Sequence, residues 1–140
     1  MHGPTGVIES PNFPNEYKND LYCTWDIKVP TGKKVRIEFK EFKTEGSNDF
    51  LYIFDTGKTD PIISFSGVSY KPLPLTSSGN SIRIRFVSNG AINSNGFQLH
   101  YSQVGMYTSC VNTWMQGFLD FKLFSKMFRC KQCIPVKCWK

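Results

Sequence analysis

Short stretches in which apolar and polar residues alternate limit what this chain can fold into. In residues 34–40, Val35, Ile37 and Phe39 alternate with charged side chains, which is the period of a strand with one buried and one solvated face. Further short strands are expected at residues 6–10, 23–29, 51–54, 62–65, 82–87 and 97–101. Residues 51–54 are apolar at every position, as in a strand covered on both faces. Turn residues separate these runs and no helical period precedes residue 105, so the pattern predicts an all-β, two-sheet antiparallel β-sandwich.

Charge and cysteine content change together near residue 105. The chain carries a net charge of +6, but residues 1–105 hold eleven basic and ten acidic side chains. The residues after them hold six basic side chains and one acidic side chain. They also contain four of the five cysteines, namely Cys110, Cys130, Cys133 and Cys138. We therefore expect a domain at residues 1–104 and a basic, cysteine-containing tail at residues 105–140.

The tail fits more than one interpretation. Its aromatic residues recur near helical spacing among Lys and Arg side chains, so residues 112–129 could form a basic amphipathic helix. Such a helix could contact an anionic membrane surface, promote self-association or dock on the sandwich. An unstructured end is a further alternative. The four cysteines could bind zinc or form two disulfides in an oxidising compartment. An alternatively spliced or misassigned exon would also explain so abrupt a change.

The sequence offers no recognisable set of catalytic residues. His2 lies at the start of the chain, His100 lies on an expected strand, and no nucleophile elbow, zinc-protease motif or phosphate-binding loop is present. We therefore expect the protein not to be an enzyme. The basic residues on the expected strands are balanced by Glu38 and Glu41, so nucleic acid is not an expected partner.

Two features bear on where the protein works. No apolar run approaches the ~20 residues that a membrane-spanning helix needs. Residues 1–10 lack the charged and apolar regions of a secretory signal. The segment is therefore expected to be either part of a longer secreted or ectodomain protein, or an intracellular protein.

A series of short motifs occurs along the chain in a characteristic order. They are residues 6–14, Tyr17, residues 23–27 and 30–32, Phe42 with Glu45, Asp49 with residues 51–53, residues 65–67 and 86–89, and residues 96–97 with Tyr101. Over about residues 6–104 the chain thereby resembles the CUB domain, an extracellular module of complement proteases, tolloid-like proteinases, spermadhesins and attractin-like proteins. The spacing between Glu45 and Asp49 and the Phe-Ser-Gly triplet at residues 65–67 are most similar to the attractin-like branch. The resemblance implies two five-stranded sheets in a jelly-roll-like sandwich, secretion, and binding of proteins or glycans.

The cysteines depart from the pattern that the resemblance implies. Many CUB domains have a disulfide between a cysteine just before the position of Asp49 and one in the triplet, where this chain has Ser66. Both partners are absent together, which indicates a removed bridge rather than a broken one. The second family bridge would join Cys23 to a cysteine upstream of Met1, so Cys23 is expected to be unpaired here. Loss of that bridge would remove about 2–4 kcal/mol of stability.

The resemblance also implies a calcium site that starts from an acidic loop. Glu45 and Asp49 match the two acidic ligands of that loop in the family, and Tyr17 matches the tyrosine that orients a carboxylate. Two carboxylates four positions apart repel each other unless a cation, a donor or water lies between them. The resemblance implies that the site holds Ca²⁺ and leaves one carboxylate free to accept an exposed Lys or Arg of a protein partner.

The opposite side of this site departs from the family. Asn89 stands where the family has a third acidic ligand, Ala91 replaces a usual serine, and Ile92 would offer its backbone carbonyl. Calcium affinity rises with the number of charged ligands, so the exchange of aspartate for asparagine predicts a weakened site. The alternative is that the two carboxylates are solvated and Asn89 is a turn residue. The expected function is noncatalytic extracellular protein binding that depends on calcium.

Overall fold

The computed structural model describes residues 3–67 and 72–105, in which eight strands and no helix occur. The strands are β1 (Thr5–Glu9), β2 (Tyr22–Lys28), β3 (Lys33–Lys43), β4 (Phe50–Asp55), β5 (Ile63–Phe65), β6 (Leu75–Thr76), β7 (Ser81–Val87) and β8 (Gly96–Gly105). Within these ranges there is accordingly no helix that could cross a membrane. The all-β prediction is confirmed, whereas the predicted tail lies outside the described residues.

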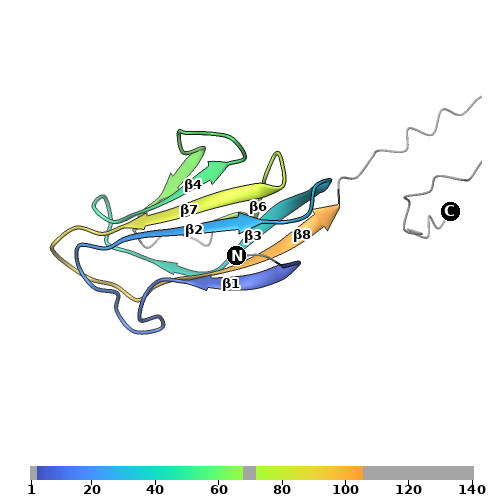
Figure 1. Cartoon of the computed structure of the whole chain (residues 1–140). Helices are drawn as coiled ribbons and strands as arrows, with labels where there is room; N and C mark the ends of the chain where they lie inside the picture. Colours follow the sequence, from blue (N-terminus) through green and yellow to red (C-terminus); the bar gives the residue numbers. More distant parts are fainter. Residues whose placement is uncertain (1–2, 68–71, 106–140) are drawn as a thin grey trace, which may run out of the picture. The chain divides into compact units, whose positions relative to one another are not determined.

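The eight strands form two antiparallel sheets that face each other (Figure 1). One sheet has the order β1-β8-β3-β6 and the other the order β2-β7-β4-β5, so the predicted sandwich is confirmed. The family resemblance implied five strands in each sheet, but four are present in each over the part of the chain that the structure describes. Between β1 and β2 some backbone donors bond within turns, such as Phe13 N to Ser10 O at 3.1 Å, and others bond singly to the segment between β7 and β8, such as Tyr17 N to Ser94 O at 3.1 Å. These residues therefore form no further strand.

Strand β3 runs three residues beyond the predicted end of the alternation because it contains a bulge. Phe39 pairs with Leu99, and Glu41 pairs with Gln98, so Lys40 is the extra residue. The bulge restores the inward direction of Phe42, whose ring centroid lies 6.0 Å from that of Phe39. Strand β3 therefore continues pairing with β8 as far as Lys43, directly before the acidic loop.

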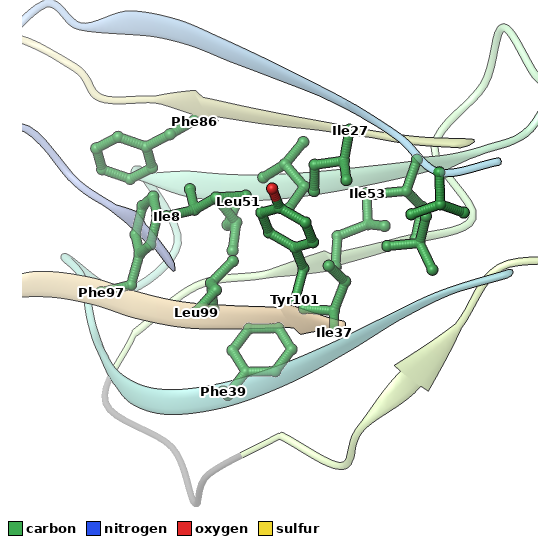
Figure 2. Packing of buried hydrophobic residues seen from close by; sticks show 14 of the residues in the cluster. Ile8, Ile27, Ile37, Phe39, Leu51, Ile53, Phe86, Phe97, Leu99 and Tyr101 are labelled. Carbon is green, nitrogen blue, oxygen red and sulfur yellow. The ribbon is translucent and has the colours of Figure 1, made fainter. Parts of the chain in front are cut away.

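The alternating apolar residues meet between the two sheets to form the core (Figure 2). The fully buried residues Leu51, Ile53 and Phe86 come from one sheet, and Ile37, Phe39, Phe97 and Leu99 come from the other. Each such side chain contributes about 1.5–3 kcal/mol of burial free energy. The core thus fixes the two sheets, and with them the loops that connect their strands.

Strand β4 has a second apolar face, as predicted for residues 51–54. Leu51 and Ile53 point into the core, whereas Phe54 belongs to the opposite face and is still only 5% exposed. The guanidinium of Arg85 lies 4.7 Å from the centre of the Phe54 ring and covers it. The outer cover of β4 is therefore a stacked arginine.

Candidate functional site

Three loops converge at one end of the sandwich, on the left in Figure 1. They are residues 10–21, 44–49 and 88–95, which connect β1 to β2, β3 to β4, and β7 to β8. Asp20 N donates to Asn89 O at 2.8 Å and Tyr17 N donates to Ser94 O at 3.1 Å. Because of these contacts, residues far apart in the sequence form one site.

Asp49 lies at the centre of this loop end and is fully buried. Its Oδ2 accepts a hydrogen bond from the Tyr17 hydroxyl, and its Oδ1 accepts one from Asn89 N at 2.8 Å. A buried carboxylate needs such donors because it has lost its water. The alternative that Asp49 is a solvated rim acid is therefore wrong.

Tyr17 holds the two acidic residues in a fixed relation. Its hydroxyl donates to Asp49 and accepts a hydrogen bond from Glu45 N at 2.9 Å. Its ring is buried and packs edge-on against Phe86, with 5.0 Å between the ring centroids. Burial raises the pKa of Tyr17 far above its ordinary value, and the hydrogen bond to Asp49 raises it further. The phenol therefore stays protonated and remains a donor to the Asp49 carboxylate.

Glu45 carries an oxygen that lacks a partner. Its Oε1 accepts a hydrogen bond from Asn48 Nδ2 at 2.8 Å, whereas its Oε2 is buried without a hydrogen bond to any described residue. A buried acceptor that no donor satisfies calls for an explanation, and an ordered water or a bound cation would provide one. Among the described residues, no cluster of three or more His, Cys, Asp or Glu side chains could hold a metal.

Asn93 is a site candidate that sequence reasoning missed. Its Oδ1 is likewise buried and without a hydrogen-bond partner in the described ranges, and it belongs to the same loop as Asn89. The sequence between Asn89 and Gly96 consists mainly of turn residues, so no residue pattern distinguishes Asn93 from its neighbours. Its unsatisfied oxygen became visible only once the burial of the loop was known.

Asn89 connects the loops mainly through its backbone. Its N–H donates to Asp49, its C=O accepts from Asp20, and its side-chain Oδ1 accepts from Ala91 N at 2.9 Å, which is an Asx turn. The structure therefore brings Asn89 to the acidic loop together with Tyr17, Glu45 and Asp49.

The remaining two predicted site residues lie on the surface of the same loop. Ala91 is exposed, and Ile92 is 69% exposed. Within the described ranges, no hydrogen bond joins either residue to Glu45 or Asp49.

Hydrogen bonds tie the acidic loop to the end of β5, where the resemblance implied a lost disulfide. Ser66 Oγ accepts from Ser47 N at 2.9 Å and donates to Glu45 O at 3.0 Å. Next to it, Gly67 N donates to Thr44 Oγ1 at 2.9 Å. The loop is therefore braced by polar contacts that involve the serine of the Phe-Ser-Gly triplet.

Cys23 is half-buried on β2, and burial raises the pKa of its thiol. It forms no disulfide with any residue of the described ranges. The four cysteines of the predicted tail lie outside those ranges.

Comparisons with known proteins agree with this architecture. A family model described as the CUB domain matches residues 1–101. The chain is 36% identical to cubilin of Rattus norvegicus over 118 residues, which cover 81% of this chain and 3% of cubilin. It is also 36% identical to tolloid-like protein 1 of Homo sapiens over 108 residues, which cover 73% of this chain and 11% of that protein.

Solved structures show the same likeness. The full extracellular region of zebrafish Gpr126/Adgrg6 matches with a TM-score of 0.69 and 30% identity, over 75% of this chain and 14% of that one. The MASP-1 CUB2 domain bound to Ca²⁺ matches with a TM-score of 0.64 and 25% identity, over 73% of this chain and 95% of that one.

These comparisons place the chain in a family and leave its branch untested. The chain spans 3% of rat cubilin and 11% of human tolloid-like protein 1. Membership of the attractin-like branch stays a prediction. Since the family model covers most of the sequence and the two sheets match solved members, the chain belongs to the CUB domain family.

Proposed function

We propose that this chain is a noncatalytic extracellular recognition module whose loop end binds Ca²⁺ and, with the ion in place, a basic side chain of a protein partner. CUB domains generally mediate protein–protein interaction and occur in extracellular proteins. A solved CUB domain with this fold is described as bound to Ca²⁺. The residues of the loop end support carrying this property over to the present chain.

One observation carries the proposal: the Oε2 of Glu45 is buried and has no hydrogen-bond partner among the described residues. Removing a carboxylate oxygen from water without giving it a donor is strongly unfavourable, and a bound divalent cation would offset this cost by supplying positive charge. Calcium takes six to eight oxygen ligands from carboxylates, amide and backbone carbonyls, and water. The loop end offers oxygens of these kinds.

The residues would divide the work as follows. Glu45 and Asp49 would supply the charged oxygens, and Asn93 Oδ1, which is buried without a hydrogen bond to any described residue, would supply an amide oxygen. Tyr17 would hold Asp49 in orientation through its hydrogen bond. Asn89 would position Asp49 through its N–H, and Ile92 would add its backbone carbonyl. With two carboxylates rather than three, we expect an affinity at the weak end of the calcium range, at about 0.1–1 mM.

The surface around the proposed calcium site could accept a basic side chain of a partner together with the apolar residues beside it. A carboxylate that shares its oxygens between Ca²⁺ and a Lys or Arg forms a charge-assisted hydrogen bond to the latter. Ile92 is 69% exposed on the neighbouring loop, and such an exposed apolar side chain next to a polar site gives a partner something to pack against. Calcium would thus order the loops, and a carboxylate of the site would bind the basic side chain of the partner.

A lysine-rich peptide and its fully acetylated counterpart provide a test by surface plasmon resonance. We expect the unmodified peptide to bind in millimolar Ca²⁺ and to lose binding in EGTA or on acetylation. Glu45→Gln should abolish the calcium-dependent part, whereas Glu41→Gln, a change at an exposed residue, should leave it intact. Binding of the unmodified peptide that is equal with Ca²⁺ and EGTA would contradict the proposal.

A further inference from the structure

The outer face of the β2-β7-β4-β5 sheet carries a group of large side chains that the proposed function does not use. We call it the aromatic face, and it consists of Tyr22, Phe50, Tyr52, Phe54, Arg85 and Val87. Tyr22 pairs with Val87, which pairs with Phe50, and Arg85 pairs with Tyr52 in the next row. Their sequence neighbours Leu51, Ile53, Ile84 and Phe86 point into the core, so these residues share the opposite face of the sheet.

Arg85 lies at the centre of the aromatic face, between two rings. Its Cζ is 5.2 Å from the centre of the Tyr22 ring and 4.7 Å from the centre of the Phe54 ring, and both distances are within the range of cation–π attraction. The stacking fixes the plane of the guanidinium. The two rings therefore hold a positive charge in one orientation.

This charge has no acidic partner among the described residues. Arg83 on the same strand forms a fork with Asp26, with Nε–Oδ1 at 2.6 Å and Nη2–Oδ2 at 3.1 Å. Arg85, in contrast, forms no ion pair within the described ranges, and its Nε is buried without a hydrogen bond. A guanidinium that is fixed in orientation, partly desolvated and without a counter-ion is suited to bind a carboxylate of another molecule.

The surroundings of Arg85 resemble the centre of a protein interface. Phe50 and Tyr52 stack on each other with 5.7 Å between their centroids, and Tyr22 is 66% exposed. Tyr, Phe and Arg are the residues enriched in interface centres. Several charged side chains elsewhere on the two outer faces are paired: Arg83 with Asp26 on the same sheet, and Arg36 and Lys40 with Glu38 on the other sheet.

We propose that the aromatic face binds a segment of a partner protein that presents an Asp or Glu carboxylate flanked by apolar side chains. The carboxylate would accept hydrogen bonds from the guanidinium of Arg85, and the flanking side chains would pack on Tyr22, Phe50 and Tyr52. A second copy of this chain is a poorer occupant, since a symmetric contact centred on Arg85 would bring two positively charged guanidinium groups together. The surface uses no carboxylate of the calcium site and is expected to work without Ca²⁺.

The test is a titration of the ¹⁵N-labelled full chain in EGTA with two hexapeptides, Gly-Leu-Trp-Glu-Phe-Gly and the same peptide with Gln in place of Glu. The Glu peptide should bind about tenfold more tightly than the Gln peptide, which corresponds to about 1.4 kcal/mol. It should shift the Nε–Hε signal of Arg85 and the amide signals of β2, β7 and β4.

Two substitutions test the proposal independently, so that one remains informative if the other disturbs folding. Arg85→Lys keeps the charge and most of the alkyl cover but loses the stacked fork, and Tyr22→Ser alters a largely exposed residue. Each should reduce affinity for the Glu peptide about tenfold or more, whereas Arg36→Lys on the other sheet should not. Equal affinity for both peptides, shifts confined to other strands, or no binding at millimolar peptide would overturn the proposal. Binding of a uronic-acid oligosaccharide in place of both peptides would also overturn it.

Discussion

The Tyr17 hydroxyl is the single group through which the acidic pair is held together. It donates to the Asp49 carboxylate and accepts from Glu45 N at 2.9 Å. A hydrogen bond to a charged group contributes about 1.5–3 kcal/mol to folding stability, and burying a donor without a partner costs about 1–3 kcal/mol. One oxygen atom thus affects both the stability of the domain and the geometry of the proposed site.

Tyr17→Phe is expected to lower the free energy of unfolding by about 2–4 kcal/mol, because Asp49 loses a donor and Glu45 N loses its acceptor. Urea denaturation followed by Trp fluorescence measures the change. Tyr52→Phe is the matched control, since the Tyr52 hydroxyl forms no hydrogen bond in the described ranges, and it should change stability by less than about 0.5 kcal/mol. Equal effects of the two substitutions would show that the Tyr17 hydroxyl is not the structural link described here.

Asn89→Asp is expected to strengthen calcium binding by about tenfold, because a third carboxylate would join the site. Isothermal titration calorimetry measures this affinity. In EGTA the same substitution should lower the melting temperature, since the new charge would lie close to Asp49, which accepts from Asn89 N at 2.8 Å. A variant with unchanged calcium affinity would exclude Asn89 from the surroundings of the ion.

At the scale of elements, the acidic loop depends on the end of β5. Ser66 contacts Ser47 N and Glu45 O, and Gly67 N donates to Thr44 Oγ1 at 2.9 Å. Strand β5 is only three residues long and pairs with β4 over those three residues. The loop is thus attached through hydrogen bonds to the residues that follow a short edge strand, and no disulfide joins these segments in the described ranges.

Ser66→Ala is expected to lower the free energy of unfolding by about 1–2 kcal/mol, because Ser47 N and Glu45 O each lose a partner. Hydrogen exchange should also speed up at the amides of residues 45–49. Ser64→Ala is the control, as Ser64 is exposed on β5, two residues before Ser66. If exchange in the loop is the same in both variants, the brace does not depend on the Ser66 hydroxyl.

The alternation of apolar residues predicted most of the strands, because burial of one face leaves a period of two in the sequence. It missed β6, whose two residues are too few to show a period. It also ended β3 early, because the extra Lys40 shifts the pattern by one position. Local patterns therefore indicate strands well and irregular pairing poorly.

The sequence predicted only some of the residues of the acidic site. Glu45, Asp49, Tyr17 and Asn89 were identified by resemblance, and the structure brings them together. The bracing by Ser66 and the unsatisfied oxygen of Asn93 depend on how loops distant in sequence pack, which no local pattern encodes.

In the domain as a whole, the end of the sandwich opposite the acidic loop is also held by a carboxylate, that of Asp55. Burial acts to raise the pKa of Asp55, but hydrogen bonds from Ser78 and Thr56 outweigh it and hold the pKa below its ordinary value of 3.8. Ser78 N donates to Oδ1 and Oδ2 at 2.9 and 3.0 Å, and Thr56 N donates to Oδ1 at 2.7 Å. This carboxylate connects the β4–β5 turn to the segment before β7.

The depressed pKa has a defined effect on stability. The contribution of Asp55 is complete above the unfolded-state pKa, near 3.8, and disappears as the pH falls from there through the lower folded-state value. Urea titrations between pH 7 and pH 2.5 should therefore show stability falling in the acidic part of the range. In Asp55→Asn the domain should be less stable at pH 7 and its acid dependence shallower. An unchanged slope in this variant would show that other carboxylates govern acid unfolding.

Thermal unfolding at increasing Ca²⁺ concentration tests whether calcium completes the loop end. A ligand that binds the folded state alone stabilises it by about 2.7 kcal/mol at one hundred times its dissociation constant. We predict that the melting temperature of the full chain rises with Ca²⁺ up to tens of millimolar, that EGTA reverses the rise, and that Glu45→Gln abolishes it while Glu41→Gln does not. A melting temperature that is the same at every Ca²⁺ concentration, or a rise that survives in Glu45→Gln, would contradict the account.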